Sequence, residues 1–157
     1  LQTAVVDVVE SVTRVAGDVT SVNEEVEVEI RADKGAKVVA NQKLFDRATS
    51  NLVLNAMAYG GAKIYIDIRV FENECVVDVQ DTGAGIPEED RPKVVKPFVR
   101  LGKKKTKGTG LGLAIVSRIM RLHGGELHIV DSPLGGASVQ LVWKNAETGS
   151  RARGLGR

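Results

Sequence analysis

The sequence has little cysteine, few aromatic residues and no long apolar run. A single cysteine, Cys75, among 157 residues excludes an internal disulfide framework and suits a reducing compartment. No apolar run approaches the roughly 18 residues that a bilayer span requires, and no signal peptide is visible. The formal net charge of +2 is nearly neutral and points neither to nucleic acid nor to an anionic membrane. With 43% hydrophobic residues, the chain still has enough apolar surface for the core of one globular domain.

Hydrophobic periodicity predicts helices and strands without an internal repeat. Valines at helical spacing predict a helix over residues 1–16. A second helix is predicted from a cap at Asn41 to about Tyr59, and a third from about Leu111 to a stop at residues 123–125. Alternating apolar residues predict strands at 26–30, 37–40, 64–70, 77–79, 127–129 and 139–143.

This order of elements predicts an α+β fold, a two-layer α/β sandwich. A mixed, mostly antiparallel sheet of about five strands is expected to carry three helices on one face. The segment 88–107 holds many charges and few core residues, so we expect a mobile excursion with one short helix. The polar residues from 145 to 157 predict a disordered tail.

Three glycines at alternate positions, Gly108, Gly110 and Gly112, lead into the third predicted helix. Such a loop exposes backbone N–H groups and the positive end of the helix dipole, which together favour an anion, most often phosphate. Taken alone, the pattern also fits a flexible connector followed by a core helix. A second glycine motif upstream, and two asparagines before it, favour the binding site.

These upstream motifs lie at the end of the second helix and after a strand. Asn51, Asn55 and Tyr59 are spaced four residues apart and therefore share one helix face. Asparagines inside a helix carry a propensity cost, so they are either solvent-facing or functional. The second motif, Asp81-Thr82-Gly83-Ala84-Gly85-Ile86-Pro87, ends the strand in a glycine loop.

In combination, the motifs resemble the ATP-binding catalytic domain of sensor histidine kinases. This domain belongs to the Bergerat-fold (GHKL) superfamily, with type II topoisomerases, mismatch-repair ATPases and heat-shock chaperones. NLVLNA at 51–56 resembles the asparagine box, DTGAGIP at 81–87 and GTGLGL at 108–113 the two glycine boxes, and KPFVR at 96–100 the phenylalanine box. The resemblance covers nearly the whole chain. It implies a catalytic domain over residues 1–144 with an ATP lid at about 86–109.

The resemblance also implies a site for ATP and Mg²⁺. Asn55 would bind Mg²⁺ through its side-chain oxygen, and Asn51 would support the same cluster. Asp81 would accept a hydrogen bond from the adenine amino group, where guanine instead presents a carbonyl. Tyr59 would lie along the adenine ring.

The other ATP contacts that the resemblance implies come from the glycine boxes and the lid. They are Gly83, Gly85, Ile86, Arg100, Lys107, Gly108, Thr109, Gly110, Leu111, Gly112 and Leu113. Lys103, Lys104, Lys105 and Lys107 either neutralise the terminal phosphates or form a solvated loop. Phe98 is expected to anchor the lid rather than to touch ATP.

Asn51 separates transfer from hydrolysis. Hydrolysing members of the superfamily carry Glu at this position as a general base, and Asn cannot take a proton at neutral pH. The domain is therefore expected to transfer the γ-phosphoryl group of ATP to a histidine, which requires mainly positioning and charge neutralisation. His123 and His128, the two histidines of the chain, lack the acceptor context of the family and are predicted to be structural.

The acceptor histidine is expected on a helical dimerisation domain upstream, because the chain begins with Leu1 instead of Met. The parent would be a membrane-bound sensor kinase with this domain in the cytoplasm and a response regulator as its downstream partner. The isolated domain is expected to be monomeric and not to bind nucleic acid.

Three alternatives remain open from the sequence. A serine kinase of the anti-sigma-factor type shares the fold, although the phenylalanine box argues against it. Ala58 stands where the kinases usually place Lys or Arg, which leaves room for a pseudokinase that binds ATP without transferring phosphate. A hydrolysing switch is disfavoured by Asn51.

Overall fold

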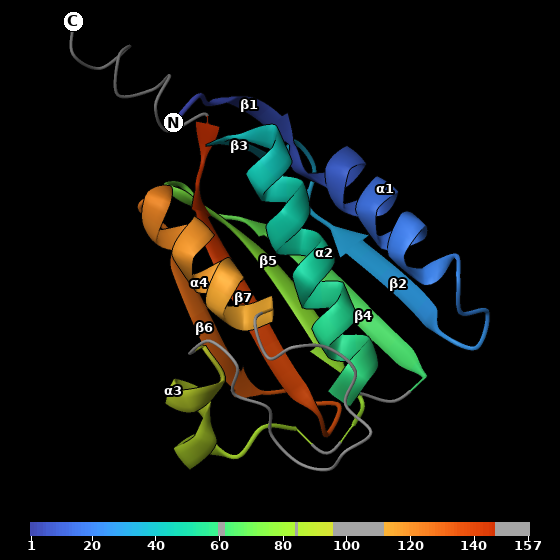
Figure 1. The fold of residues 1–157 in the computed structure, drawn as a ribbon. Helices are drawn as coiled ribbons and strands as arrows, with labels where there is room; N and C mark the ends of the chain where they lie inside the picture. Colours follow the sequence, from blue (N-terminus) through green and yellow to red (C-terminus); the bar gives the residue numbers. More distant parts are fainter. Residues whose placement is uncertain (60–61, 84, 96–111, 147–157) are drawn as a thin grey trace, which may run out of the picture.

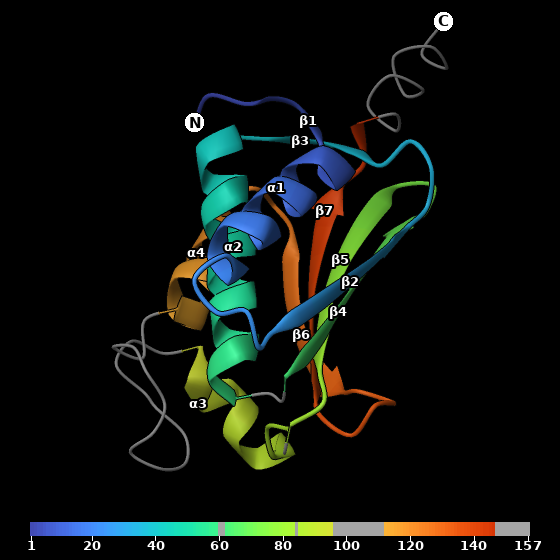
Figure 2. The same cartoon turned by 90° about the vertical axis from the view of Figure 1, so that its right-hand side faces the viewer.

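The computed structural model describes residues 1–59, 62–83, 85–95 and 112–146. Three long helices, α1 (Val8–Thr20), α2 (Gln42–Tyr59) and α4 (Gly112–Leu122), lie on one face of a sheet. The view along the sheet shows these helices on one side, and no helix of the described residues lies on its other face (Figure 2). The predicted two-layer sandwich is confirmed. None of the described helices is long and apolar enough to cross a membrane.

The main sheet has five strands in the order β2-β4-β5-β7-β6. Their bounds are β2 (Glu27–Ala32), β4 (Lys63–Val70), β5 (Glu74–Asp81), β6 (Glu126–Asp131) and β7 (Ala137–Lys144). β2 pairs with β4 in parallel, and the other three pairings are antiparallel. The sheet is therefore mixed and mostly antiparallel, as predicted (Figure 1).

The core lies between the helices and the sheet because successive strand residues point to opposite faces. Along β4, Ile64, Ile66 and Ile68 are all buried beneath the helices. Trp143 of β7 and Phe45 of α2 join the two layers, with ring centroids 4.9 Å apart. Both side chains are buried, so α2 is held firmly against the centre of the sheet.

Local signals set the ends of α2 and α4. The side chain of Asn41 accepts a hydrogen bond from the Leu44 N–H at 3.1 Å, which confirms the predicted cap. After α4, Gly124 adopts a left-handed conformation with φ of 66°, and the Gly125 N–H bonds the Met120 carbonyl at 2.8 Å. This pattern is a Schellman motif, and it confirms the predicted stop.

The prediction of a helix from the first residue was wrong. β1 (Ala4–Asp7) pairs antiparallel with β3 (Lys37–Ala40) in a separate two-stranded sheet, and α1 begins only at Val8. Asp7 caps α1 by accepting a hydrogen bond from the Glu10 N–H at 3.1 Å. Valine has a high strand propensity, so a valine-rich stretch fits both periods until its pairing partner is known.

Two further predictions fall at the limits of the described chain. In the segment after β5, a 3-10 turn, η1 (Glu88–Asp90), and a short helix, α3 (Arg91–Val94), are present, while residues 96–109 of the expected lid lie outside the described residues. Asn145, predicted to begin a disordered tail, is buried, and its side chain donates to the Phe71 carbonyl at 3.0 Å. Residues 147–157 of that tail lie outside the described residues.

Candidate nucleotide-binding site

Asp81 is the centre of the candidate site. It is the last residue of β5 and lies on the helix-covered side of the sheet, with 4% of its surface exposed. Its Oδ1 accepts hydrogen bonds from the Gly83 N–H at 2.9 Å and the Ala137 N–H at 3.4 Å. The described residues provide no donor for Oδ2. One oxygen of this carboxylate is therefore held by the backbone, and the other remains available to a ligand.

Burial raises the pKa of Asp81, and the two backbone hydrogen bonds oppose that rise. Desolvation disfavours the charged form of an acid, while donors to the charged form stabilise it. A ligand that donates a hydrogen bond to Oδ2 would add a third donor. The environment of Asp81 thus favours a bound ligand that donates a hydrogen bond to Oδ2 over a buried carboxylate that lacks this donor.

The site depends on Gly136, whose role the sequence analysis missed. A Cβ on Gly136 would lie 2.1 Å from Asp81 Oδ1 and 2.3 Å from the Asp81 carbonyl oxygen. Only a glycine in the β6–β7 turn therefore lets this turn approach β5 so closely. The adjacent glycines at 135 and 136 were the available signal, but they indicated only a turn.

The first glycine box packs against the same turn. Gly85 has φ of 80°, a conformation that favours glycine, and its Cβ position lies 3.5 Å from the Gly136 backbone. Ile86 follows with 4% of its surface exposed and joins the core. The structure thus places Asp81, Gly83, Gly85 and Ile86 beside the β6–β7 turn or in the adjoining core; their contact with ATP stays a prediction.

Asn51 and Asn55 lie on the last two turns of α2 and are both half-buried. Among the described residues, the buried amide nitrogen of Asn51 has no hydrogen-bond partner. A buried donor without a hydrogen-bond partner lowers the stability of the protein by about 1–3 kcal/mol. It fits a phosphate oxygen, and the carboxamide oxygen of Asn55 is a ligand type that Mg²⁺ accepts.

The start of α4 supplies the remaining described part of the site. The first backbone N–H groups of a helix have no partner within it, and α4 begins at Gly112. The Leu113 side chain is buried in the core, so only its backbone can face a ligand. Arg100, Lys107, Gly108, Thr109, Gly110, Leu111 and the side chain of Tyr59 lie outside the described residues, as do the phenylalanine box and the other lid lysines.

His123 is structural, as predicted. Its Nε2 accepts a hydrogen bond from the Asn41 N–H at 3.1 Å, and its Nδ1 lies 2.7 Å from the Ile119 carbonyl oxygen. The neutral tautomer with the proton on Nδ1 satisfies both contacts. His123 therefore joins the end of α4 to the start of α2. His128 lies on the helix-free face, with Nε2 3.6 Å from Glu126.

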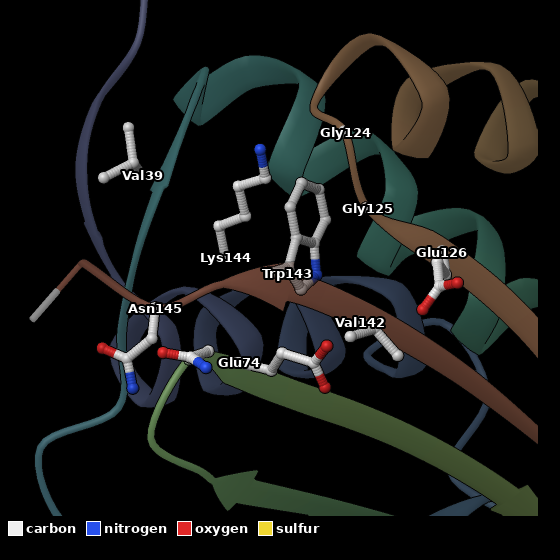
Figure 3. Close-up of a pocket in the computed structure, with 10 residues that line it drawn as sticks. Val39, Glu74, Gly124, Gly125, Glu126, Val142, Trp143, Lys144 and Asn145 are labelled. Atoms are coloured by element: carbon white, nitrogen blue, oxygen red, sulfur yellow. The ribbon is translucent and has the colours of Figure 1, made fainter. Parts of the chain in front are cut away.

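A separate pocket lies at the other end of the sheet (Figure 3). It has a volume of about 660 Å³ and is lined by the start of β5, the start of β6, the end of β7 and Val39. Glu74 in this pocket is the first residue of β5, whereas Asp81 is the last. The pocket shares no residue with the predicted ATP site.

Comparison with known proteins shows the family of the chain. Residues 40–147 match the family of histidine kinase-, DNA gyrase B- and HSP90-like ATPases, and the chain belongs to this family. The sensor histidine kinase CpxA of Escherichia coli is 36% identical over 66% of this chain and 23% of its own length. The sensor-type histidine kinase PrrB of Mycobacterium leprae is 34% identical over 87% of this chain and 31% of its own length. The chain thus spans about a quarter to a third of these relatives.

A solved structure extends the likeness to the whole domain. The ATP-binding domain of PrrB from Mycobacterium tuberculosis is 25% identical, with a TM-score of 0.79, over 92% of this chain and 98% of that domain. The resemblance to histidine kinase ATP-binding domains and the predicted fold are confirmed. The described chain is an ATP-binding domain of the type found in two-component kinases.

Proposed function

We propose that this domain binds Mg-ATP and transfers the γ-phosphoryl group to a histidine on a separate helical dimerisation domain of the same parent protein. The observation that carries the proposal is Asp81, a buried carboxylate whose Oδ1 accepts from two backbone N–H groups and whose Oδ2 has no donor in the described part of the chain. An amino group of a base is the complement of such an acceptor. Membership in the ATPase family supports adenine as that base.

Asp81 would discriminate between purines by the hydrogen-bonding group that the base presents to it. The adenine amino group donates a hydrogen bond to Oδ2, whereas guanine places a carbonyl oxygen against the same carboxylate. A buried acceptor that has no donor and faces a second acceptor is unfavourable. This cost is enough for a preference for adenine over guanine on the order of 10³-fold. The backbone contacts to Oδ1 keep the carboxylate oriented for this recognition.

The phosphate end of the site would be formed by α2 and α4. The Asn51 amide and the first N–H groups of α4 would donate to phosphate oxygens, and the Asn55 side-chain oxygen would hold the metal. Bound Mg²⁺ would neutralise charge on the transferred phosphoryl group. Ala58 provides no charge at the position where a basic residue is common in the kinases, so the lid lysines and Arg100 are the candidate cations for this task.

Asn51 also favours transfer over hydrolysis. Its amide cannot take a proton from water, so this position offers no general base. We expect the acceptor to come from outside the chain, because both ring nitrogens of His123 are engaged inside the domain and His128 lies in β6 without the acceptor context of the family. We infer a parent sensor kinase that carries the acceptor domain, sits in a membrane with this domain in the cytoplasm, and passes phosphate to a response regulator.

Calorimetric titration with ATP, with and without Mg²⁺, tests the binding step. We expect micromolar, magnesium-enhanced binding by the wild type and loss of the magnesium effect in Asn55→Ala. Asn23→Ala is the matched control, because Asn23 lies in the loop after α1 and its side-chain oxygen accepts a hydrogen bond from the nearby Glu25 N–H at 3.1 Å. A well-folded wild type that binds no ATP would contradict the proposal.

The transfer step is tested by mixing the domain with the separately produced dimerisation domain of its parent. We expect an acid-labile, base-stable phosphohistidine. An acid-stable product would favour the serine kinase, and steady ATP turnover by the domain alone would favour a hydrolase. ATP binding without transfer would favour the pseudokinase that Ala58 leaves open.

A further inference from the structure

Two backbone segments contact Asp81, the glycine box through the Gly83 N–H and the β6–β7 turn through the Ala137 N–H. The segment that follows the glycine box begins with η1 and α3. Asp81 Oδ1 accepts from the Ala137 N–H, and Gly85 packs on Gly136. The orientation of Asp81 therefore depends on how the turn is held relative to its neighbours.

Arg91 joins two of these segments with one side chain. Its Nε donates to the Ile86 carbonyl oxygen at 3.0 Å, and its Nη2 lies 2.5 Å from Asp131 Oδ1. The Arg91 side chain is 17% exposed, whereas the Asp131 side chain is 89% exposed. The planar guanidinium reaches both partners at once, which a lysine with its single nitrogen cannot do.

Asp131 transmits this attachment to the turn. It is the last residue of β6 and pairs with Ala137, the residue whose N–H reaches Asp81. Within the turn, the Ser132 N–H donates to the Gly136 carbonyl at 2.8 Å. A contact that holds Asp131 therefore also limits the movement of Gly136 and Ala137.

We propose that Arg91 is a positioning residue for base recognition, which ties the segment after the glycine box to the β6–β7 turn and thereby holds the Ala137 N–H and Gly136 against Asp81. The inference rests on the proposed nucleotide binding but goes beyond it, because Arg91 belongs to none of the motifs that predicted the site. The ion pair itself adds little stability, since Asp131 is exposed. The effect of the Arg91–Asp131 contact is expected in the preference of the site for a base that carries the amino group.

The experiment compares two diphosphates by calorimetry: ADP, and purine riboside diphosphate, which lacks the amino group. The variants are Arg91→Met, which retains the aliphatic stem, Asp131→Asn, which changes an exposed residue, and the double variant. Lys93→Met is the matched control, because Lys93 lies on the same helix and its described ion pair is local, with Asp90 at 3.6 Å. Thermal unfolding of each protein verifies that the variants are folded.

Arg91→Met and Asp131→Asn are each expected to weaken ADP binding about fivefold, the effect of losing one modest polar contact. Binding of purine riboside diphosphate should change much less, so the preference for ADP falls. The double variant should be no worse than the stronger single variant, because both changes break the same link. Lys93→Met should bind both ligands like the wild type.

Two results would overturn the inference alone. One is wild-type ADP affinity in both Arg91→Met and Asp131→Asn. The other is an equal loss for both ligands, since that would make Arg91 a general attraction for the diphosphate instead of a positioning residue. Failure of the wild type to bind ADP would instead reject the proposed function, and the inference with it.

Discussion

Replacing Gly136 by alanine perturbs the closest approach in the candidate site. The new Cβ would lie 2.1 Å from Asp81 Oδ1 and 2.3 Å from the Asp81 carbonyl oxygen, both below the 3.0 Å that Cβ contacts keep. One of these atoms is backbone, so the clash cannot be relieved by a side-chain rotation. The β6–β7 turn must move away from β5, and overpacking of this kind costs about 1–3 kcal/mol.

The same movement should impair nucleotide binding. The Ala137 N–H already donates to Asp81 Oδ1 at 3.4 Å, so a shift of the turn breaks this hydrogen bond. Without it, Asp81 loses one of the two contacts that orient its free oxygen. We expect ADP binding to weaken at least about tenfold, which corresponds to roughly 1.4 kcal/mol.

Gly135→Ala separates this effect from a general loss of stability. Gly135 has φ of 101°, so alanine is strained there by about 1–2 kcal/mol, yet no atom lies within 4 Å of its Cβ position. Urea unfolding of the unliganded proteins and calorimetry with ADP should show two destabilised variants, of which only Gly136→Ala binds ADP weakly. Equal ADP affinity in the two variants would refute the argument.

Three further predictions follow from single residues. Burial raises the pKa of Asp81 above its unfolded value, so its ionisation opposes folding and the unliganded wild type should gain stability as the pH falls through the folded-state pKa. Asp81→Asn should lose this pH dependence in urea unfolding, be more stable than the wild type at neutral pH, and fail to bind ADP; lower stability at neutral pH would contradict the assignment. Cys75 is fully buried with a pKa raised to about 12, so a thiol reagent should label it only as fast as the domain unfolds, and rapid labelling of the native protein would be inconsistent with the fold. Asn41→Ala removes the cap of α2 and should cost about 1 kcal/mol in thermal unfolding, while ADP affinity stays unchanged because the cap lies at the opposite end of α2 from Asn55.

The parts of the fold that could be predicted depend on neighbours in the sequence. Asn41 caps α2 through the Leu44 N–H three residues away, and Gly124 ends α4 through bonds within the same turn. The burial of the alternating isoleucines of β4 follows from strand geometry alone. By contrast, the valines of β1 fit both a helix and a strand, and pairing with β3 decided between them.

The helix-free face shows a second limit of pattern reading. Alternation places Asp78 on that face, where a solvated side chain is expected, yet only 2% of its surface is exposed. Its carboxylate accepts hydrogen bonds from Arg69 at 3.1 Å, Gln80 at 3.0 Å and Ser138 at 2.6 Å. These partners come from three strands, so no window along the chain contains the network that compensates the buried charge.

The candidate site also has a part that the sequence predicts and a part that depends on tertiary structure. The sequence by itself determined its chemical groups, namely the carboxylate of Asp81, the amides of Asn51 and Asn55 and the glycines around them, because motif spacing follows from local geometry. Only the tertiary structure decided which oxygen of Asp81 accepts the backbone hydrogen bonds and which residues donate them. Gly136 lies 55 positions from Asp81 in the chain, as their numbers in the sequence give, and it is brought to Asp81 by the pairing of β7 with β5. Contacts of this kind are set by strand order and register, which depend on the packing of the whole sheet.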